Sequence, residues 1–327
     1  KRPSNNRSLD IAITKSVNDN VRDYFIEKYL YAIKNKENSI VIKDNEIICF
    51  DRNEEKVFYL VKEILDLYPE AKLTICLGSI TNTHRLLEVF ELHKPDIVYH
   101  AAANKHVPLG EQNVHEFIYN NIKGTINLAT IALNYVSKFV FISTDKAVEP
   151  SSVMGYTKRM CEKYLLSLNK NIVICRFGNI IGSSGSVYEI FDKQAQKGTI
   201  TVTHEEMERY FITVEKAVSN LIYSSNFNSG LYIFNMGNSV KIMNIAKSYQ
   251  HIHNCNINIT GLREGEKLKE KLHYNFEKVQ STSNENILEV ITPIDVEDKI
   301  FINKLALNAN NLTKEQIITK FKQINHE

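Results

Sequence analysis

Hydrophobic positions along the chain follow two alternating patterns from about residue 47 onward. Short apolar runs predict strands buried on both faces, and apolar residues every three or four positions predict helices. The predicted strands cover residues 47–50, 73–77, 97–102, 139–143 and 172–177, and the predicted helices cover residues 53–67, 84–93, 114–136 and 154–168. Strands that alternate with helices indicate an α/β fold, a Rossmann-like doubly wound parallel sheet with helices on both faces.

The pattern changes after residue 177. Glycines at positions 178, 182 and 185, with serines between them, predict a loop, and the later strands and helices are less regular. We therefore expect a dinucleotide-binding domain over residues 1–177, in which residues 1–45 form an atypical lead-in. A smaller C-terminal substrate-binding lobe is expected over residues 178–327, with the substrate between the two.

Four polar residues follow the apolar run 139–142. They are Ser143, Thr144, Asp145 and Lys146, and they supply two hydroxyls, a carboxylate and an ammonium. The carboxyl end of a buried parallel strand is where open α/β sheets bind ligands. These groups could transfer protons there. A polar turn with an Asx-type cap is the alternative interpretation.

Composition narrows the classes of function. The chain has 327 residues, enough for two domains or one large domain with a lobe, and a formal net charge of +2, so no nucleic-acid partner is expected. Its five cysteines show no CxxC spacing, which suits a reducing compartment, and no metal site is expected. No apolar stretch is long enough to predict a membrane span. We expect a cytoplasmic protein, or the soluble portion of a membrane-anchored one.

Nine sequence blocks stand in the order found in one enzyme family. They cover residues 100–108, 120–125, 143–147, 153–158, 176–179, 182–187, 201–204, 209–211 and 261–267. Together they resemble the CapD/WbpM-type nucleotide-sugar 4,6-dehydratases of bacterial polysaccharide and glycan synthesis, which are extended short-chain dehydrogenase/reductase proteins. The resemblance covers roughly residues 46–290. It implies UDP-N-acetylglucosamine as substrate, a tightly held NAD or NADP, a 4-keto-6-deoxy sugar product and a homo-oligomer.

Several residues are expected to bind the cofactor. Asp51 ends a predicted strand, where a carboxylate can accept both ribose hydroxyls and favours NAD over NADP, although Arg52 could accommodate a 2′-phosphate. The alternative role for Asp51 is a helix N-cap, and both roles can hold at once. The other expected contacts are the small residues Ala101, Ala102 and Ala103, together with Lys105, Asn121, Ser143 and Lys158. A solvated loop lysine is the alternative for Lys105.

Met154 and Lys158 are four residues apart, on one face of a predicted helix. The wider superfamily carries a catalytic Tyr and Lys at these positions, and the membrane-linked branch of the family has Met in place of Tyr. Tyr156 lies two residues further along, about 200° round the helix, so we expect a partly buried tyrosine without a catalytic role. Lys158 is expected to bond the nicotinamide ribose and to favour ionised acids nearby.

The resemblance implies a reaction in three events. Hydride leaves carbon 4 for NAD⁺, a proton leaves carbon 5, and water leaves carbon 6 before the hydride returns there. We expect Asp145 to protonate the leaving 6-hydroxyl, Lys146 to be the base at carbon 5, and Thr144 to bind the 4-hydroxyl. Burial and the charge of Lys158 would favour the neutral amine that Lys146 needs. Asp145, acting through Thr144 or a water, is the expected acceptor of the 4-hydroxyl proton.

The resemblance also assigns residues to the substrate. These are Lys105, His106, Asn179, Thr201, Arg209, Arg263 and Glu266. The planar fork of arginine suits a diphosphate, and Glu266 can accept ribose hydroxyls. The alternative is an ordinary surface ion pair between Arg263 and Glu266.

One expected motif is missing. The first glycine is Gly78, so residues 1–46 contain no glycine-rich phosphate-binding turn. Either residues 11–20 are a degenerate remnant of the first strand and turn, or a segment is missing before residue 46 and residues 16–34 form a lead-in helix. We favour the second because the later blocks are intact. Two alternative functions are a nucleotide-sugar 4-epimerase, against which Met154 argues, and a pseudoenzyme that lacks the cofactor.

Overall fold

A computed structural model describes residues 11–14, 46–67, 69, 71–182 and 186–325. Its main feature is a sheet with the strand order β14-β15-β11-β6-β5-β4-β1-β2-β3. Neighbours from β3 to β11 are parallel, whereas β15 runs antiparallel to β11 and to β14. The strands are β1 (Ile11–Thr14), β2 (Glu46–Asp51), β3 (Lys72–Leu77), β4 (Ile97–His100), β5 (Lys138–Thr144), β6 (Ile172–Phe177), β11 (Gly230–Phe234), β14 (Lys278–Ser281) and β15 (Ile287–Ile291).

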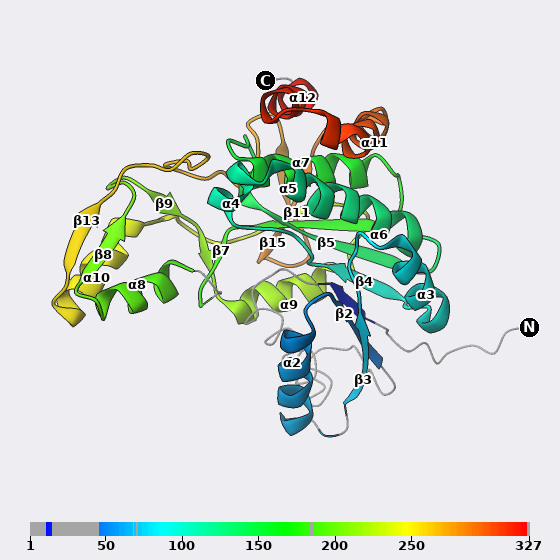
Figure 1. The fold of residues 1–327 in the computed structure, drawn as a ribbon, viewed down its shortest axis with the longest axis horizontal. Helices are drawn as coiled ribbons and strands as arrows, with labels where there is room; N and C mark the ends of the chain where they lie inside the picture. Colours follow the sequence, from blue (N-terminus) through cyan, green and yellow to red (C-terminus); the bar gives the residue numbers. More distant parts are fainter. Residues whose placement is uncertain (1–10, 15–45, 68, 70, 183–185, 326–327) are drawn as a thin grey trace, which may run out of the picture.

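Helices cover both faces of this sheet (Figure 1). One face carries α3 (Thr83–His93), α6 (Gly124–Ala132), α7 (Val153–Leu166), α11 (Asp298–Asn308) and α12 (Lys314–Asn325). The opposite face carries α2 (Glu54–Leu67) and α9 (Val214–Ser224). The strands of the middle of the sheet are buried on both sides, which is why they read as continuous apolar runs.

Strand β1 lies between β2 and β4, the position that the first strand of a doubly wound sheet takes. Residues 11–14 therefore serve as the first strand, as the first explanation for the missing glycines requires. The residues that follow β1, including the expected lead-in helix at 16–34, lie outside the described residues.

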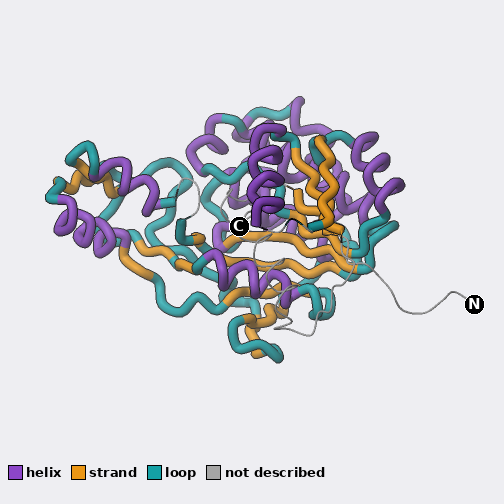
Figure 2. Tube along the Cα trace, turned by 90° about the horizontal axis from the view of Figure 1, so that it is seen from below, coloured by secondary structure: helices purple, strands orange, loops and turns teal. Residues whose placement is uncertain are grey.

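A small lobe extends from the sheet (Figure 2). It contains the parallel pair β8 (Thr199–Val202) and β13 (Asn256–Ile259), packed with α8 (Val187–Ala195) and α10 (Ile242–His253) around a separate apolar cluster. The chain after residue 178 also returns to the main sheet as β11, β14 and β15. Two short ladders, β7 (Asn179–Ile180) with β10 (Phe211–Ile212) and β9 (Glu208–Arg209) with β12 (Val240–Lys241), connect the two parts.

Predicted helix 114–136 differs from the structure. It is divided into α5 (Val114–Phe117), the π-helix η1 (Ile118–Lys123) and α6, while a separate short helix α4 (Val107–Gln112) precedes it. Asn121 within η1 bonds the loop after β4, since its amide donates to Asn104 O at 3.0 Å and accepts from Asn104 N at 2.6 Å. A π-helical turn of this kind often marks a functional part of a helix.

Candidate functional site

Strand β5 ends in the polar residues that the sequence predicts to be functional. They are Ser143, Thr144, Asp145 and Lys146, here called the tip. After Thr144 the chain makes a 3₁₀ turn, η2 (Asp145–Ala147), and the Thr144 hydroxyl accepts from Lys146 N at 3.3 Å while it donates to Asp145 Oδ1 at 2.8 Å. The Lys146 ammonium lies 3.0 Å from the same Asp145 oxygen and 3.1 Å from Asn179 Oδ1. The structure therefore joins Thr144, Asp145 and Lys146, three of the five residues predicted to be catalytic, into one hydrogen-bonded group with Asn179.

Asp145 lies behind Lys146. Its side chain is fully buried, whereas 21% of the Lys146 side chain is exposed and lines a cavity. Asp145 Oδ2 has no hydrogen-bond donor among the described residues. A buried acceptor without a donor costs about 1–3 kcal/mol, so this oxygen is suited to a proton or to a donor from a ligand.

Two glycines allow the chain to pack closely around the tip. A Cβ atom at Gly155, in the first turn of α7, would lie 2.4 Å from Lys146 O, and one at Gly178 would lie 2.9 Å from Asp145 Oδ2. Helix α7 begins there because Ser152 Oγ accepts from Gly155 N at 3.1 Å. The absence of a side chain at Gly155 therefore sets the distance between the catalytic turn and α7.

Helix α7 carries the pair expected in place of Tyr and Lys. Lys158 is buried, donates to Ile142 O, and its ammonium lies 3.9 Å from the centre of the Phe141 ring. Burial lowers the pKa of Lys158 to about 8. Met154 is buried in the apolar core. Tyr156 stacks on Phe321 with ring centres 5.2 Å apart, which agrees with a packing role.

Asp51 and the alanines 101–103, which are expected to bind the cofactor, lie at the carboxyl ends of the two strands on either side of β1. Asp51 is buried at the end of β2 and its carboxylate accepts from Asn53 N at 2.8 Å, while Asn53 caps α2 by accepting from Lys56 N. Arg52 is exposed. The three alanines 101–103 are buried directly after β4. A carboxylate at the end of β2 and small side chains after β4, on either side of β1, fit a dinucleotide laid across this edge of the sheet. The turn that would follow β1 lies outside the described residues.

Two expected cofactor residues have protein partners. Asn121 donates to Thr157 Oγ1 at 3.0 Å as well as bonding Asn104. Ser143 is buried, and its hydroxyl donates to Glu162 Oε1 at 2.6 Å. Both residues thus support the site from behind.

A buried ionic cluster beneath the tip was not identified from the sequence. Arg176 donates to Glu162 Oε2 and to Glu277 Oε2, each at 2.7 Å, and all three side chains are buried. Burial opposes ionisation of Glu162, but the Arg176 guanidinium holds the pKa of that carboxyl below its usual value. The sequence signal for this cluster was the position of Arg176 within an apolar predicted strand, because a buried charge requires a partner.

A cavity of about 260 Å³ lies between the tip and the small lobe. The predicted residues that line it are Lys146, Asn179, Thr201, Arg209, Arg263 and Glu266. Lys105, which is half-buried, and the exposed His106 precede a lining residue, Val107, but do not line the cavity themselves. The structure thus brings most of the predicted substrate residues to one cavity that Lys146 also lines.

The arginines at this cavity have different surroundings. Arg209 is buried and donates to Lys267 O at 2.9 Å, so part of its guanidinium holds the neighbouring chain segment. Arg263 is 57% exposed, and its Nε lies 3.9 Å from Glu266 Oε1. The predicted ion pair is therefore present, but it is long and exposed, and such a pair contributes little to stability.

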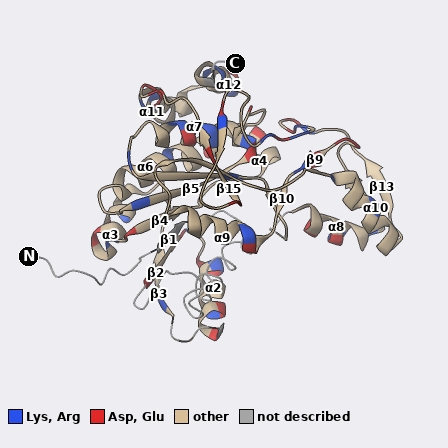
Figure 3. Ribbon diagram, turned by 180° about the vertical axis from the view of Figure 1, so that it is seen from behind, with Lys and Arg blue, Asp and Glu red and all other residues tan. Residues whose placement is uncertain are grey.

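Three further observations concern charge, metal binding and hydrophobicity. Lysine, arginine and acidic residues are interspersed along the ribbon (Figure 3). Within the described part of the chain, no group of three or more His, Cys, Asp or Glu residues could hold a metal ion. No described helix has both the length and the apolar character needed to cross a membrane.

Comparison with known proteins places these features in a family. A family model described as polysaccharide biosynthesis protein matches residues 36–292. The capsular polysaccharide biosynthesis protein CapD of Staphylococcus aureus is 38% identical over 296 residues, which cover 84% of this chain and 48% of that protein. The chain thus spans about half the length of that relative.

Other relatives match over most of both chains. A UDP-N-acetylglucosamine 4,6-dehydratase (inverting) of Campylobacter jejuni is 32% identical over 285 residues, or 81% of each protein. A UDP-glucose 4-epimerase of Rickettsia canadensis is 32% identical over 248 residues, or 72% of this chain and 71% of the epimerase.

The fold matches solved structures. The X-ray structure of Pen from Bacillus thuringiensis superposes with a TM-score of 0.77 at 24% identity, covering 94% of this chain and 99% of that one. This likeness confirms the predicted α/β fold with a parallel Rossmann-like sheet. From the family model and the CapD similarity together, we conclude that this chain belongs to the polysaccharide biosynthesis protein family, as the nine sequence blocks predict.

Proposed function

We propose that this chain catalyses the NAD(P)-dependent 4,6-dehydration of a UDP-N-acetylhexosamine. The substrate is UDP-N-acetylglucosamine, and the product is a 4-keto-6-deoxy sugar nucleotide for bacterial polysaccharide or glycan synthesis. The observation that carries the proposal is Lys146 at the wall of a cavity that Arg263 and Glu266 also line, with the buried carboxylate of Asp145 3.0 Å behind its ammonium. An amine and a carboxylate at one place can serve as base and acid at adjacent carbons.

Residues of this chain would hold the cofactor along the carboxyl edge of the sheet. Asp51 is placed to accept ribose hydroxyls, which favours NAD, and the alanines 101–103 leave room for the dinucleotide beside the backbone. Lys158 would donate to the nicotinamide ribose. When bound, NAD(P) accepts the hydride of carbon 4 and returns it to carbon 6.

Asp145 and Lys146 also supply routes for protons. As the carboxylate, Asp145 would accept the 4-hydroxyl proton through the Thr144 hydroxyl, which donates to its Oδ1, and would then pass a proton to the leaving 6-hydroxyl. Lys146, which is partly exposed, would give one proton to solvent, take the proton of carbon 5 as the neutral amine, and return a proton to carbon 5 when carbon 6 is reduced. Each group then ends the reaction in the protonation state in which it began it, Asp145 as the carboxylate and Lys146 as the neutral amine.

A 4-epimerase is the second candidate, because an epimerase is among the similar proteins. An epimerase needs no base at carbon 5, and the wider superfamily uses a tyrosine where this chain has a buried Met154. The lysine at the cavity wall therefore favours the dehydratase. A pseudoenzyme would need neither a base at carbon 5 nor a catalytic tyrosine.

Incubation with UDP-N-acetylglucosamine and NAD⁺, followed by mass spectrometry, separates these functions. The dehydratase gives a sugar nucleotide lighter by one water. A product of unchanged mass with altered configuration would identify an epimerase, and an unchanged substrate would identify a pseudoenzyme. The variant Lys146→Ala is the matched control, because it removes the proposed base and leaves the nucleotide residues in place.

A further inference from the structure

Residues 261–274, here called the strap, connect the small lobe with the turn that follows the catalytic tip (Figure 1). Arg263 and Glu266 of the strap line the cavity. Arg209 of β9, in a ladder that connects the small lobe with the sheet, donates to Lys267 O at 2.9 Å and so holds the strap by its backbone. The strap is therefore in contact with both the nucleotide end of the cavity and the catalytic end.

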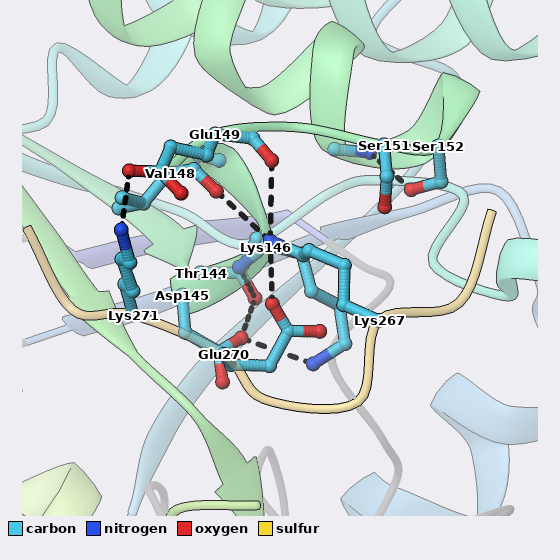
Figure 4. Close-up of polar contacts among 12 residues, drawn as sticks. Thr144, Asp145, Lys146, Val148, Glu149, Ser151, Ser152, Lys267, Glu270 and Lys271 are labelled. Carbon is cyan, nitrogen blue, oxygen red and sulfur yellow. Dashed lines mark hydrogen bonds and ion pairs between the residues drawn. The ribbon is translucent and has the colours of Figure 1, made fainter. Parts of the chain in front are cut away.

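Lys267 fastens the strap to the turn after the tip (Figure 4). Its ammonium donates to Val148 O at 2.9 Å and to Glu149 O at 3.3 Å, and it lies 2.7 Å from Glu270 Oε2. A lysine that lines a sugar-nucleotide cavity would ordinarily be assigned to the diphosphate. Here three protein oxygens surround an ammonium that has three protons to donate.

Glu149 has an unfavourable backbone conformation. Its φ is +43°, in the left-handed region that non-glycine residues rarely adopt. Its carbonyl receives the Lys267 ammonium, and its carboxylate lies 2.7 Å from the Lys271 ammonium. Two strap lysines thus stabilise this turn, which lies only three residues after Lys146.

We propose that Lys267 is a positioning residue that acts through this turn and not as a ligand of the diphosphate. By holding Glu149 in the left-handed conformation, it fixes the backbone from which Asp145 and Lys146 reach the substrate. The inference rests on the proposed function, because it assigns Lys267 a part in placing the acid and the base.

Kinetics and UDP binding of Lys267→Met test this role. We expect kcat to fall about 10- to 100-fold, because misplaced reacting groups cost rate, while the Kd for UDP changes less than twofold. Lys269→Met is the control, since Lys269 is exposed and pairs with Glu208 outside the cavity, and its kcat should stay within twofold. A Kd for UDP raised tenfold or more with kcat retained would make Lys267 a diphosphate ligand and overturn the proposal.

A second substitution tests the mechanism of positioning. Glycine adopts the left-handed conformation without steric cost, so Glu149→Gly in the Lys267→Met background should restore kcat at least fivefold. Glu149→Ala in the same background keeps the unfavourable conformation and should restore nothing. Equal kcat for the two double variants would contradict a role through the Glu149 backbone.

Hydrogen exchange in the absence of substrate separates this inference from the proposed function. In Lys267→Met the amides of residues 145–149 should exchange faster than in the wild type and in Lys269→Met, with the rest of the sheet unchanged. If exchange at 145–149 is unaltered, Lys267 does not hold the turn, whether or not the wild type is a dehydratase. If exchange rises but the wild type removes no water, the proposed function is wrong and the structural role of Lys267 stands.

Discussion

Two arginine–carboxylate groups in this molecule have opposite surroundings. Beneath the catalytic tip, Arg176 is fully buried and lies 2.7 Å from both Glu162 and Glu277. At the cavity, Arg263 is 57% exposed and 3.9 Å from Glu266. The first group is fixed on every side, whereas the second can exchange its partner for a ligand.

The buried group is suited to hold neighbouring side chains in position, whereas the exposed pair is suited to bind a ligand. A buried pair that loses one member leaves an uncompensated charge, which costs about 3–5 kcal/mol, whereas an exposed pair is worth about 0–1 kcal/mol. Ser143 hydrogen-bonds to the buried group, which fixes the backbone that leads to Asp145 and Lys146, the proposed acid and base. Proton transfer needs such fixed geometry, while diphosphate binding can use an adjustable arginine.

The largest expected effect is at the tip. Lys146→Ala should lower kcat about 10²- to 10⁴-fold, the usual contribution of a general base, with the Kd for UDP changed less than twofold. Steady-state kinetics and UDP titration check both values. A variant with turnover near that of the wild type would remove Lys146 from the reaction.

The second effect is on stability. Arg176→Met should lower the free energy of unfolding by about 3–5 kcal/mol, because it leaves Glu162 and Glu277 buried without their cation. Arg263→Met is the matched variant, and its free energy of unfolding should stay within about 1 kcal/mol of the wild type. Denaturant unfolding measures both. Equal losses in the two variants would invalidate the comparison.

The third effect is on nucleotide binding. Arg263→Ala should weaken UDP binding about 10- to 100-fold, since a hydrogen bond to a charged group is worth about 1.5–3 kcal/mol. Calorimetric titration with UDP measures it. If the affinity for UDP is unchanged, Arg263 only forms a surface ion pair with Glu266, which is the alternative that the sequence left open.

The fourth effect concerns the packing of the tip on α7. Alanine favours a helix over glycine by about 1 kcal/mol, yet a Cβ at residue 155 would lie 2.4 Å from Lys146 O. Gly155→Ala should therefore lower kcat about tenfold by displacing the turn. Gly230→Ala is the control, because its nearest neighbour would lie at an ordinary 3.4 Å. Similar kcat values for the two variants would show that the close approach of residue 155 to Lys146 O does not determine the position of Asp145 and Lys146.

The last expected effect is a dependence of stability on pH. Burial lowers the pKa of Lys158 to about 8 from 10.5, so between these values the unfolded chain binds a proton that the folded chain releases. The free energy of unfolding contributed by this group therefore rises as pH increases from about 8 toward 10.5. Denaturant unfolding across this range should show a smaller rise in Lys158→Met. The same slope in both proteins would contradict this assignment.

The sequence predicted the parts of the fold whose signal is local. Strands at 139–143 and 172–177 and the helix at 154–168 correspond to β5, β6 and α7 with shifts at their ends. The continuous helix 114–136 was wrong, because the bonds between Asn121 and Asn104 accompany a π-helical turn that apolar spacing does not reveal.

The residues of the candidate site also divide into those that a local sequence pattern predicts and those that it does not. Blocks of neighbouring residues identified the tip and the nucleotide end. The support behind them depends on distant partners, since Arg176 joins Glu162, 14 residues away, to Glu277, 101 residues away. No local pattern carries such a pairing, and the same holds for Lys267, whose acceptors are backbone carbonyls more than a hundred residues earlier in the chain.

The most direct test of the central claim is the fate of the proton on carbon 5. Wild-type protein with NAD⁺ and UDP-N-acetylglucosamine in D₂O should give a sugar nucleotide that has lost one water and carries deuterium from the solvent at carbon 5, and Lys146→Ala should give neither change. A product of unchanged elemental composition without deuterium at carbon 5, or full deuterium incorporation by Lys146→Ala, would contradict the account.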